Sequence, residues 1–220
     1  TRNVGPDAMT PEGTVNRAAL PAVFNPEDLN ALEQALRLKD ANPGSTITML
    51  TMGMPKAAEV LKEGIYRGAD EGILISDRPL GGADTLATSY TLAQAIKKVG
   101  DYDIILCGRQ AIDGDTAQVG PQVAEKLGLT QITYTEEIIS LDKEAKKIVA
   151  KRHIDGGVET VEGPLPIVVT VNGSAAPCRV RNVKRVWANK NREFTTWGAA
   201  DIEADPAQIG KAGSPTNVKA

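Results

Sequence analysis

Asp103-Ile-Ile-Leu-Cys-Gly-Arg-Gln-Ala-Ile-Asp-Gly-Asp-Thr-Ala-Gln-Val-Gly120 is the stretch that decides the fold. Its first five residues have the apolar pattern of a short buried strand. The apolar spacing from Val119 to Leu127, followed by Gly128, predicts a helix with a glycine C-cap. A strand, a glycine-bearing loop and a helix in this order predict one unit of an α/β fold.

The same order occurs upstream of this stretch. Asn25 is a predicted N-cap, Pro26 takes the first helical position, and the apolar spacing continues to about Lys39. Further strands are expected at 45–50 and 72–76, and helices at 57–66, closed by Gly68, and 85–99. Short loops join these segments, so right-handed crossovers and a Rossmann-like parallel sheet are expected. Ligands of such sheets bind beyond the carboxyl ends of the strands, where the loops 51–55, 77–85 and 108–116 lie.

After Gly128 the pattern changes to strands, predicted at 131–135, 147–154, 158–162 and 166–171. Ile154-Asp-Gly-Gly157 is a turn signal between two of them, which indicates an added antiparallel part. Residues 1–25 are expected to be irregular. Residues 198–220 are rich in Ala, Gly, Pro and Asp with little periodicity, which is typical of an arm that is disordered or lies on a partner.

The composition limits the possible functions. A chain of 220 residues suits one α/β domain, and a net charge of −3 argues against a general nucleic-acid binder. No apolar run approaches the roughly 20 residues of a membrane span. The two cysteines form no C-x-x-C pair, and there is a single histidine, so redox work would need a bound cofactor. The sequence starts at Thr1 without methionine, and we expect native residues before it.

The loop 108–120 has the features of an anion site. Asp115 or Thr116 is expected to cap the following helix, which leaves the N–H groups of Ala117, Gln118 and Val119 pointing outward at the positive end of the helix dipole. Gly114 and Gly120 would let a ligand or backbone come close. The segment is neither a G-x-G-x-x-G nor a Walker A motif, and a capped helix after a turn explains it equally well.

Another loop has the same order of a strand, a glycine turn and a helix start, with the sequence Gly81-Gly-Ala-Asp-Thr-Leu-Ala-Thr-Ser89 after the strand. The two loops at one sheet edge could hold a dinucleotide between them, although capping by Asp84 or Thr85 is the slightly better explanation. Asp113 and Asp115 are better explained by turns and capping than by a metal, so no metal site is expected. His153 is expected to face solvent or a partner, and Cys107 to act as a small apolar residue.

A basic run with interleaved apolar residues extends from Arg179 to Trp187. It is either a solvated face or a docking loop with apolar anchors, for which the candidate residues are Arg179, Val183, Arg185 and Trp187.

The quoted segments resemble the β-subunits of electron-transfer flavoproteins. The loop from Gly108 to Pro121 is similar to their nucleotide loop, and Ala150-Lys-Arg-His-Ile-Asp-Gly-Gly-Val-Glu-Thr-Val161, followed by Pro166-Ile-Val-Val-Thr170, is similar to the family signature. Asn25-Pro-Glu-Asp28 and Arg67-Gly-Ala-Asp70 also fit. The resemblance covers residues 13–190 and implies an adenine-nucleotide-binding three-layer fold like that of universal stress proteins. Family members begin with a strand that would precede Thr1.

The resemblance implies a subunit with no catalysis of its own, paired with an α-subunit whose separate domain holds an FAD. Ordinary members bind AMP in the β-subunit. Electron-bifurcating members bind a second FAD there, which takes a hydride from NADH and sends one electron to a low-potential acceptor and one to the α-subunit. The Gly82–Thr85 loop and Ala117-Gln-Val119 resemble the bifurcating and nitrogen-fixation-associated branch. The alternatives are an AMP-binding scaffold and, from another class, a stand-alone nucleotide-binding stress-type domain, against which the signature at 155–170 argues.

The resemblance also implies the partners and the ligand residues. The partners are the α-subunit, a flavin dehydrogenase of the acyl-CoA type, a ferredoxin or flavodoxin, and NAD(H) as a transient substrate, and the location is the cytoplasm of a bacterium or archaeon. NADH oxidation is expected only in the αβ complex. Residues 1–190 are expected to form the nucleotide-binding domain and 191–220 an extension onto the α-subunit. The residues carried over as ligands of FAD, or alternatively AMP, are Asn25, Met52, Gly53, Gly82, Ala83, Asp84, Thr85, Thr88, Ser89, Gly108, Asp113, Gly114, Asp115, Thr116, Ala117, Gln118, Val119 and Gly120.

Overall fold

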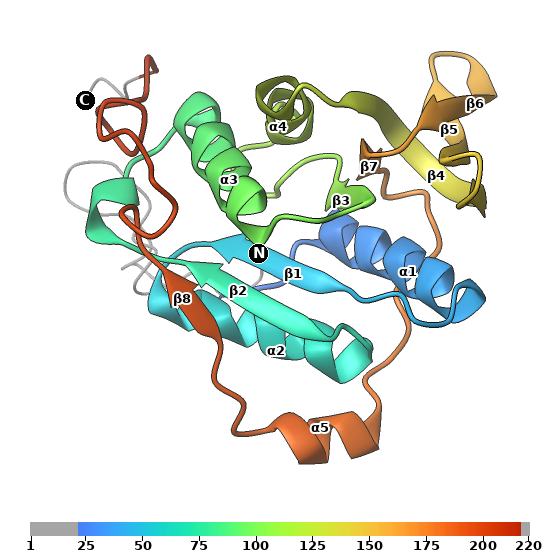
Figure 1. Cartoon of the computed structure of the whole chain (residues 1–220), viewed down its shortest axis with the longest axis horizontal. Helices are drawn as coiled ribbons and strands as arrows, with labels where there is room; N and C mark the ends of the chain where they lie inside the picture. Colours follow the sequence, from blue (N-terminus) through green and yellow to red (C-terminus); the bar gives the residue numbers. More distant parts are fainter. Residues whose placement is uncertain (1–21, 217–220) are drawn as a thin grey trace.

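The computed structural model describes residues 22–216, which form an α/β fold with two sheets (Figure 1). This confirms the predicted fold class. In chain order the elements are α1 (Pro26–Ala41), β1 (Thr48–Met52), the 3₁₀ turn η2 (Pro55–Ala57), α2 (Ala58–Arg67), β2 (Glu71–Ile75), the 3₁₀ turn η3 (Arg78–Leu80), α3 (Thr85–Val99), β3 (Ile104–Gly108), α4 (Val119–Leu127), β4 (Thr130–Asp142), β5 (Lys147–Ile154), β6 (Gly157–Pro164), β7 (Ile167–Val171), α5 (Val183–Asn189) and β8 (Thr195–Trp197).

The predicted single run of parallel strands is divided between the two sheets. β1 and β2 pair in parallel, from Thr48 opposite Glu71 to Met52 opposite Ile75. β3 pairs instead with β7, a strand some 60 residues later, from Ile104 opposite Ile167 to Gly108 opposite Val171. Among residues 22–216 no strand links β3 to β1. Within these residues the parallel strands are thus distributed over two sheets, and short local connections alone do not determine that β3 pairs with β7.

The second sheet has the order β3-β7-β4-β5-β6 and contains the predicted antiparallel part. β4 runs parallel to β7 over its first half and antiparallel to β5 over its second half. β5 and β6 form a hairpin whose two-residue turn is Asp155-Gly156, and Gly156 has a φ of 86°, which suits glycine. The turn signal in the sequence therefore predicted this hairpin correctly.

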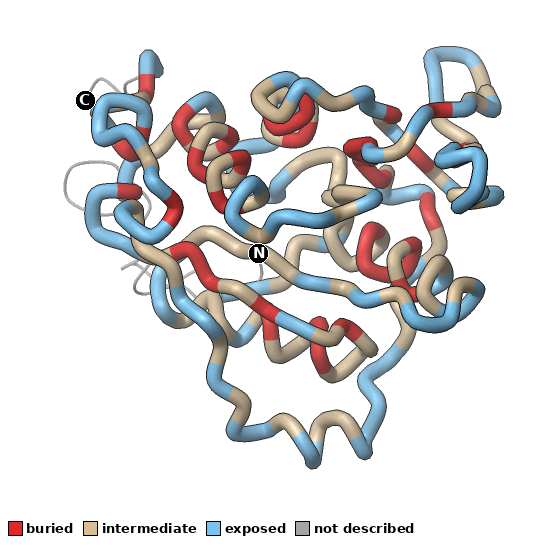
Figure 2. The backbone as a smooth tube through the Cα atoms, viewed as in Figure 1, coloured by how far each residue is buried: buried red, intermediate tan, exposed pale blue. Residues whose placement is uncertain are grey.

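The helices cover these sheets, and Figure 2 shows buried residues along them; the buried residues are mostly aliphatic. α1 packs on β3 and β7, α2 packs on β1 and β2, and α3 packs against α4. One core cluster lies between α1 and the second sheet and includes Ile148, Ile167, Val169 and Val171. A smaller one joins α1 and α2 through Leu36 and Ile65.

The C-terminal arm packs on this chain's own sheet. β8, which no sequence pattern indicated, extends the first sheet by pairing with β2, with Ile73 opposite Thr195 and Ile75 opposite Trp197. Ile202 and Ile209 are buried in a cluster with Ile75. Residues 195–209 thus contribute to the core of this chain, and a contact of the arm with a second subunit remains a prediction.

Candidate functional site

The two glycine-bearing loops meet at the starts of α3 and α4. The Thr85 hydroxyl donates a hydrogen bond of 2.9 Å to the side-chain oxygen of Gln118. α3 follows β2, and α4 follows β3, so the two loops leave the carboxyl ends of strands in different sheets. The predicted neighbourhood of the loops is therefore present, and it spans the boundary between the two sheets.

Asp84 organises the first loop. It is the N-cap of α3, one of the two residues expected there, and its carboxylate accepts hydrogen bonds from the N–H groups of Leu86 (2.9 Å) and Ala87 (3.1 Å). Burial raises the pKa of this carboxyl, but the backbone donors outweigh that effect and hold the pKa below its usual value. Asp84 also binds the C-terminal arm, because its other carboxylate oxygen accepts from the Thr216 N–H (3.1 Å) and its own N–H donates to Ser214 (2.8 Å).

The remaining predicted residues of this loop differ in their accessibility. Gly82 is exposed with a φ of 74°, Ala83 and Thr88 are half-buried, and Ser89 is fully buried. The Ser89 hydroxyl donates to the carbonyl of Leu86 within its own helix (2.9 Å). The surface that the first loop offers to a ligand is thus made by residues 82–85 and 88.

The second loop has an unusual backbone before α4. Asp115 and Ala117 both have left-handed φ values, 55° and 53°. The prediction that Asp115 or Thr116 caps the helix was wrong: the N-cap is Gln118, without a side-chain capping hydrogen bond. The Asp115 carboxylate instead accepts a hydrogen bond from the Gln110 side chain. The hydrogen bonds inside α4 begin with the N–H of Gln122, which donates to the Gln118 carbonyl, and Pro121 has no N–H. The first N–H groups of α4 therefore have no acceptor within the helix.

The glycines of the second loop have different roles. Gly120 is buried, and a Cβ there would lie 2.6 Å from the Thr170 methyl and 3.1 Å from the Cys107 sulfur. It lets α4 approach β7 and β3 closely. Gly114 is exposed, and a Cβ there would meet no atom within 4 Å. Asp113 and Thr116 are exposed as well.

Asn25 connects the start of α1 to the loop after β3. Its side-chain nitrogen donates to the carbonyl of Gln110 (2.9 Å) and to the carboxylate of Asp28 (3.0 Å). Its side-chain oxygen is buried and has no hydrogen-bond partner. Because a buried polar atom is normally satisfied, this acceptor marks a position where a ligand donor would fit.

Two acidic residues in the first turn of α1 also hold this loop. Asp28 accepts from the Gly108 N–H (2.6 Å), and burial raises the pKa of its carboxyl. Glu27 pairs with Arg109 (3.0 Å) and accepts from the Gln110 N–H (2.9 Å). A Cβ at Gly108 would lie 2.7 Å from the Asp28 nitrogen. Gly108 therefore permits the close packing of α1 on this loop.

Met52 is the last residue of β1, and Gly53 follows it at the carboxyl end of the strand. The Gly53 N–H donates to the carbonyl of Ile75 (3.0 Å), and Met52 packs against the cluster around Ile75. The Gly53 N–H is thus engaged with β2 and not with either glycine-bearing loop.

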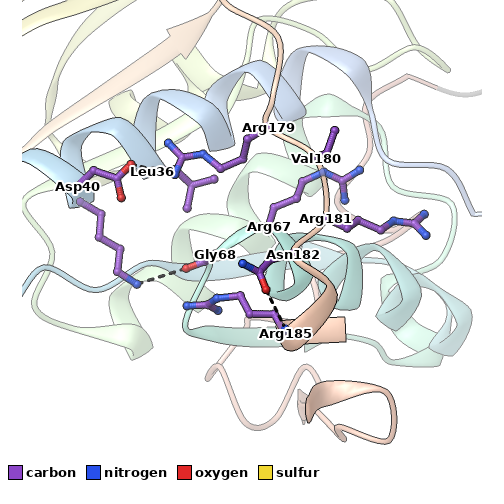
Figure 3. A pocket seen from close by; sticks show the side chains of 10 residues that line it. Leu36, Asp40, Arg67, Gly68, Arg179, Val180, Arg181, Asn182 and Arg185 are labelled. Carbon is purple, nitrogen blue, oxygen red and sulfur yellow. Dashed lines mark hydrogen bonds and ion pairs between the residues drawn. The ribbon is translucent and has the colours of Figure 1, made fainter. Parts of the chain in front are cut away.

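The basic run forms a strap whose arginines bind this chain (Figure 3). Arg179 pairs with Glu33 (3.0 Å) and Asp40 (2.8 Å), and Arg185 donates to the carbonyls of Ile65 (3.2 Å) and Ala69 (3.0 Å). A cavity of about 370 Å³ lies beneath them. The short helix α5, which was expected to be a loop, is capped by the Asn182 side chain. Val180 before the helix and Val183 and Trp187 within it are 86%, 81% and 75% exposed.

Groups outside the loops complete the inventory. His153 is exposed and lies 3.3 Å from Glu136, and burial raises the pKa of the Cys107 thiol to about 12. Over residues 22–216 no group of three or more His, Cys, Asp or Glu side chains is placed to hold a metal. In the same part of the chain, none of the helices combines the length and the apolarity that crossing a bilayer requires.

Comparisons with known proteins agree on one family. A family model described as "Electron transfer flavoprotein domain" matches residues 12–202. The chain is 48% identical over 212 residues to the "Electron transfer flavoprotein subunit beta" of Megasphaera elsdenii, covering 94% of this chain and 77% of the relative. It is 45% identical over 206 residues to the "Caffeyl-CoA reductase-Etf complex subunit CarD" of Acetobacterium woodii (94% and 78% covered), and 42% identical over 212 residues to "Protein FixA" of Sinorhizobium fredii (94% and 74% covered).

Proposed function

The chain belongs to the electron transfer flavoprotein family and is similar to its β-subunits, and we propose that it binds an FAD between its two glycine-bearing loops and takes part in electron bifurcation with an α-subunit. The observation that carries this proposal is the hydrogen bond between Thr85 and Gln118, which joins the first turn of α3 to the N-cap of α4. Two helix starts held side by side suit the two phosphates of a dinucleotide.

The residues around the loops fit the adenosine part of such a ligand. The buried, unpartnered side-chain oxygen of Asn25 accepts a hydrogen bond from a ribose hydroxyl or an adenine amino group. The N–H groups at the start of α4 donate to phosphate oxygens, because the N-cap Gln118 makes no side-chain capping hydrogen bond that would occupy them. An AMP would use the same two contacts, so they support a nucleotide but do not select FAD.

The first loop favours FAD with NADH. Gly82 is exposed and left-handed, and the loop is fixed on both sides, by Asp84 as the cap of α3 and by the bonds from Asp84 to Ser214 and Thr216. A rigid glycine loop permits a second nucleotide to approach closely. When bound, FAD supplies the hydride acceptance and the one-electron transfers; the chain's part is to hold it, orient it and place NADH beside Gly81–Thr85.

The electrons would leave towards an α-subunit flavin and a ferredoxin or flavodoxin, and an acyl-CoA-type dehydrogenase would dock on the strap. Val183 and Trp187 are exposed on α5, whereas Arg179 and Arg185 are engaged with this chain. The apolar pair is therefore the better candidate for the docking contact, with the arginines as its support.

The test is the flavin content of the purified αβ pair, followed by anaerobic mixing with NADH. Two flavins per pair, with bleaching of flavin absorbance by NADH alone, are expected. One flavin and one AMP per pair would instead make the chain an AMP-binding scaffold. Two flavins of which neither is reduced by NADH, while a dehydrogenase reduces the α-subunit flavin, would leave the cofactor assignment standing and remove bifurcation.

A further inference from the structure

A second groove lies on the opposite side of α1 from the strap, between the end of α1 and the second half of β4. Its volume is about 340 Å³. Gln34 and Arg37 line it from the helix, and Ile139 and Leu141 line it from the strand. None of these residues contributes to the nucleotide loops or to the strap helix α5.

One edge of β4 is open along this groove. β7 pairs with β4 only from Thr130 to Thr135, whereas β5 occupies the other edge as far as Asp142. Among the described strands, none pairs with the β7-side edge of β4 beyond Thr135. The helix partly takes the place of a strand there, because the Gln34 side-chain oxygen accepts a hydrogen bond from the Ile138 N–H (3.0 Å).

Gln34 also presents a donor that has no acceptor. Its side chain is 2% exposed, and its amide nitrogen makes no hydrogen bond. The orientation of the amide is fixed, because a flip would turn the NH₂ group towards the Ile138 N–H and place two donors together. A buried donor without an acceptor costs free energy, so an occupant of the groove that supplies an oxygen would be favoured.

The rim of the groove is apolar and positively charged. Ile139 is 51% exposed, and the Arg37 side chain is 50% exposed. Arg37 contacts Glu33 at 3.3 Å, but the same carboxylate accepts three hydrogen bonds of 3.0 to 3.1 Å from Arg179. Most donors of the Arg37 guanidinium therefore remain available to an acidic group.

We propose that an extended segment of the α-subunit lies in this groove along the open edge of β4. Its main-chain carbonyl accepts from the Gln34 amide, an apolar side chain packs on Ile139, and an acidic side chain pairs with Arg37. An extended chain is the occupant that matches both an open strand edge and an isolated amide donor. The inference rests on the proposed function, because it takes the α-subunit as the partner.

The experiment measures association of the purified αβ pair in a dilution series by size-exclusion chromatography. Ile139→Arg places a charge in the contact and should raise the dissociation constant at least about tenfold, and Arg37→Gln should raise it about threefold or more. Val158→Arg is the matched control, since Val158 is 49% exposed on β6 and does not line the groove. It should change the constant less than about twofold.

A photo-cross-linking residue at position 139 provides a second measurement that does not depend on destabilising the pair. It should join the β-chain to the α-subunit, whereas the same residue at position 158 should not. Unchanged association of Ile139→Arg, or no cross-link from position 139, overturns the inference. Flavin content and NADH reduction of the wild-type pair report on the proposed function separately, so this surface can fail while that function stands.

Discussion

Replacing Gly120 by alanine tests whether the close approach of α4 to the sheet positions the nucleotide loop. The new Cβ would lie 2.6 Å from the Thr170 methyl and 3.1 Å from the Cys107 sulfur. Carbon atoms pack at about 3.5–4.0 Å, so the start of α4 or Thr170 has to move by roughly 1 Å. Thr170 is held in place, since it is 1% exposed and its hydroxyl accepts from the Tyr134 N–H (3.1 Å).

The expected loss of stability follows from two opposing effects. Overpacking of a core contact costs about 1–3 kcal/mol. Alanine gains about 0.5–1 kcal/mol over glycine inside a helix. Gly120→Ala should therefore lower the free energy of unfolding by about 1–2 kcal/mol, which at a urea m-value of about 2 kcal/mol/M moves the midpoint down by roughly 0.5–1 M. Gly114→Ala is the matched control in the same loop: it meets no atom within 4 Å, and its stability should stay equal or rise slightly.

The assay is urea unfolding followed by tryptophan fluorescence, together with the nucleotide content of the purified protein. Gly120→Ala should also reduce nucleotide content, because a displaced helix start moves the N–H groups that face the phosphates. Thr170→Ser removes the clashing methyl but keeps the hydroxyl, so it should restore much of the stability in the double variant. Equal midpoints for Gly120→Ala and Gly114→Ala would refute the reasoning.

Three further substitutions test the loops and the strap. Ala117→Asp should lower nucleotide content by about tenfold by repelling the phosphates, whereas Ala117→Asn, which also tolerates a left-handed backbone, should retain it; equal content in both would make the phosphate assignment wrong. The pKa of Asp84 is lower in the folded than in the unfolded protein, so the stability that its ionised carboxylate contributes is present above the unfolded pKa and is lost as pH falls through the folded pKa. Asp84→Asn should therefore flatten the decline of the urea midpoint on the acid side. An unchanged decline would assign the pH dependence to other carboxyls. Val183→Asp should slow electron transfer to the dehydrogenase, while Val158→Asp should leave that rate unchanged. Both flavins should be retained in Val183→Asp, because an acidic residue is compatible with the first turn of α5. Loss of flavin in that variant would point to a folding defect instead.

Local signals predicted most of the elements correctly. Asp84 before an apolar-periodic run predicted the cap and the range of α3, and Gly128 predicted the end of α4. The hairpin at Asp155-Gly156 also followed from its turn residues. These features depend on neighbours in the sequence, which explains why the sequence alone was sufficient for them.

The errors concern long-range pairing and irregular backbone. Nothing near β3 indicates that its partner is β7, and the three residues of β8 are too few for a periodic pattern. The cap of α4 was misassigned because a left-handed Ala117 is not expected from sequence. Within the site, the roles of Glu27 and Asp28 were missed because acids in a first helical turn already had a sufficient local explanation. The Asn182 cap before Val183 was the signal that could have revealed α5.

The ion pairs of the strap have a consequence for how a partner would associate with it. The sequence there suggests an electropositive patch, yet Arg179 and Arg181 neutralise Glu33, Asp40 and Glu63 of the same chain. Part of the long-range attraction of an acidic partner is thus cancelled before encounter, while the exposed Lys184 still carries its charge beside Val183 and Trp187. Association through this face should therefore depend less on ionic strength than the four basic residues between Arg179 and Trp187 suggest, so that raising the salt from about 0.05 M to about 0.5 M, over which the Debye length falls severalfold, lowers the rate only modestly.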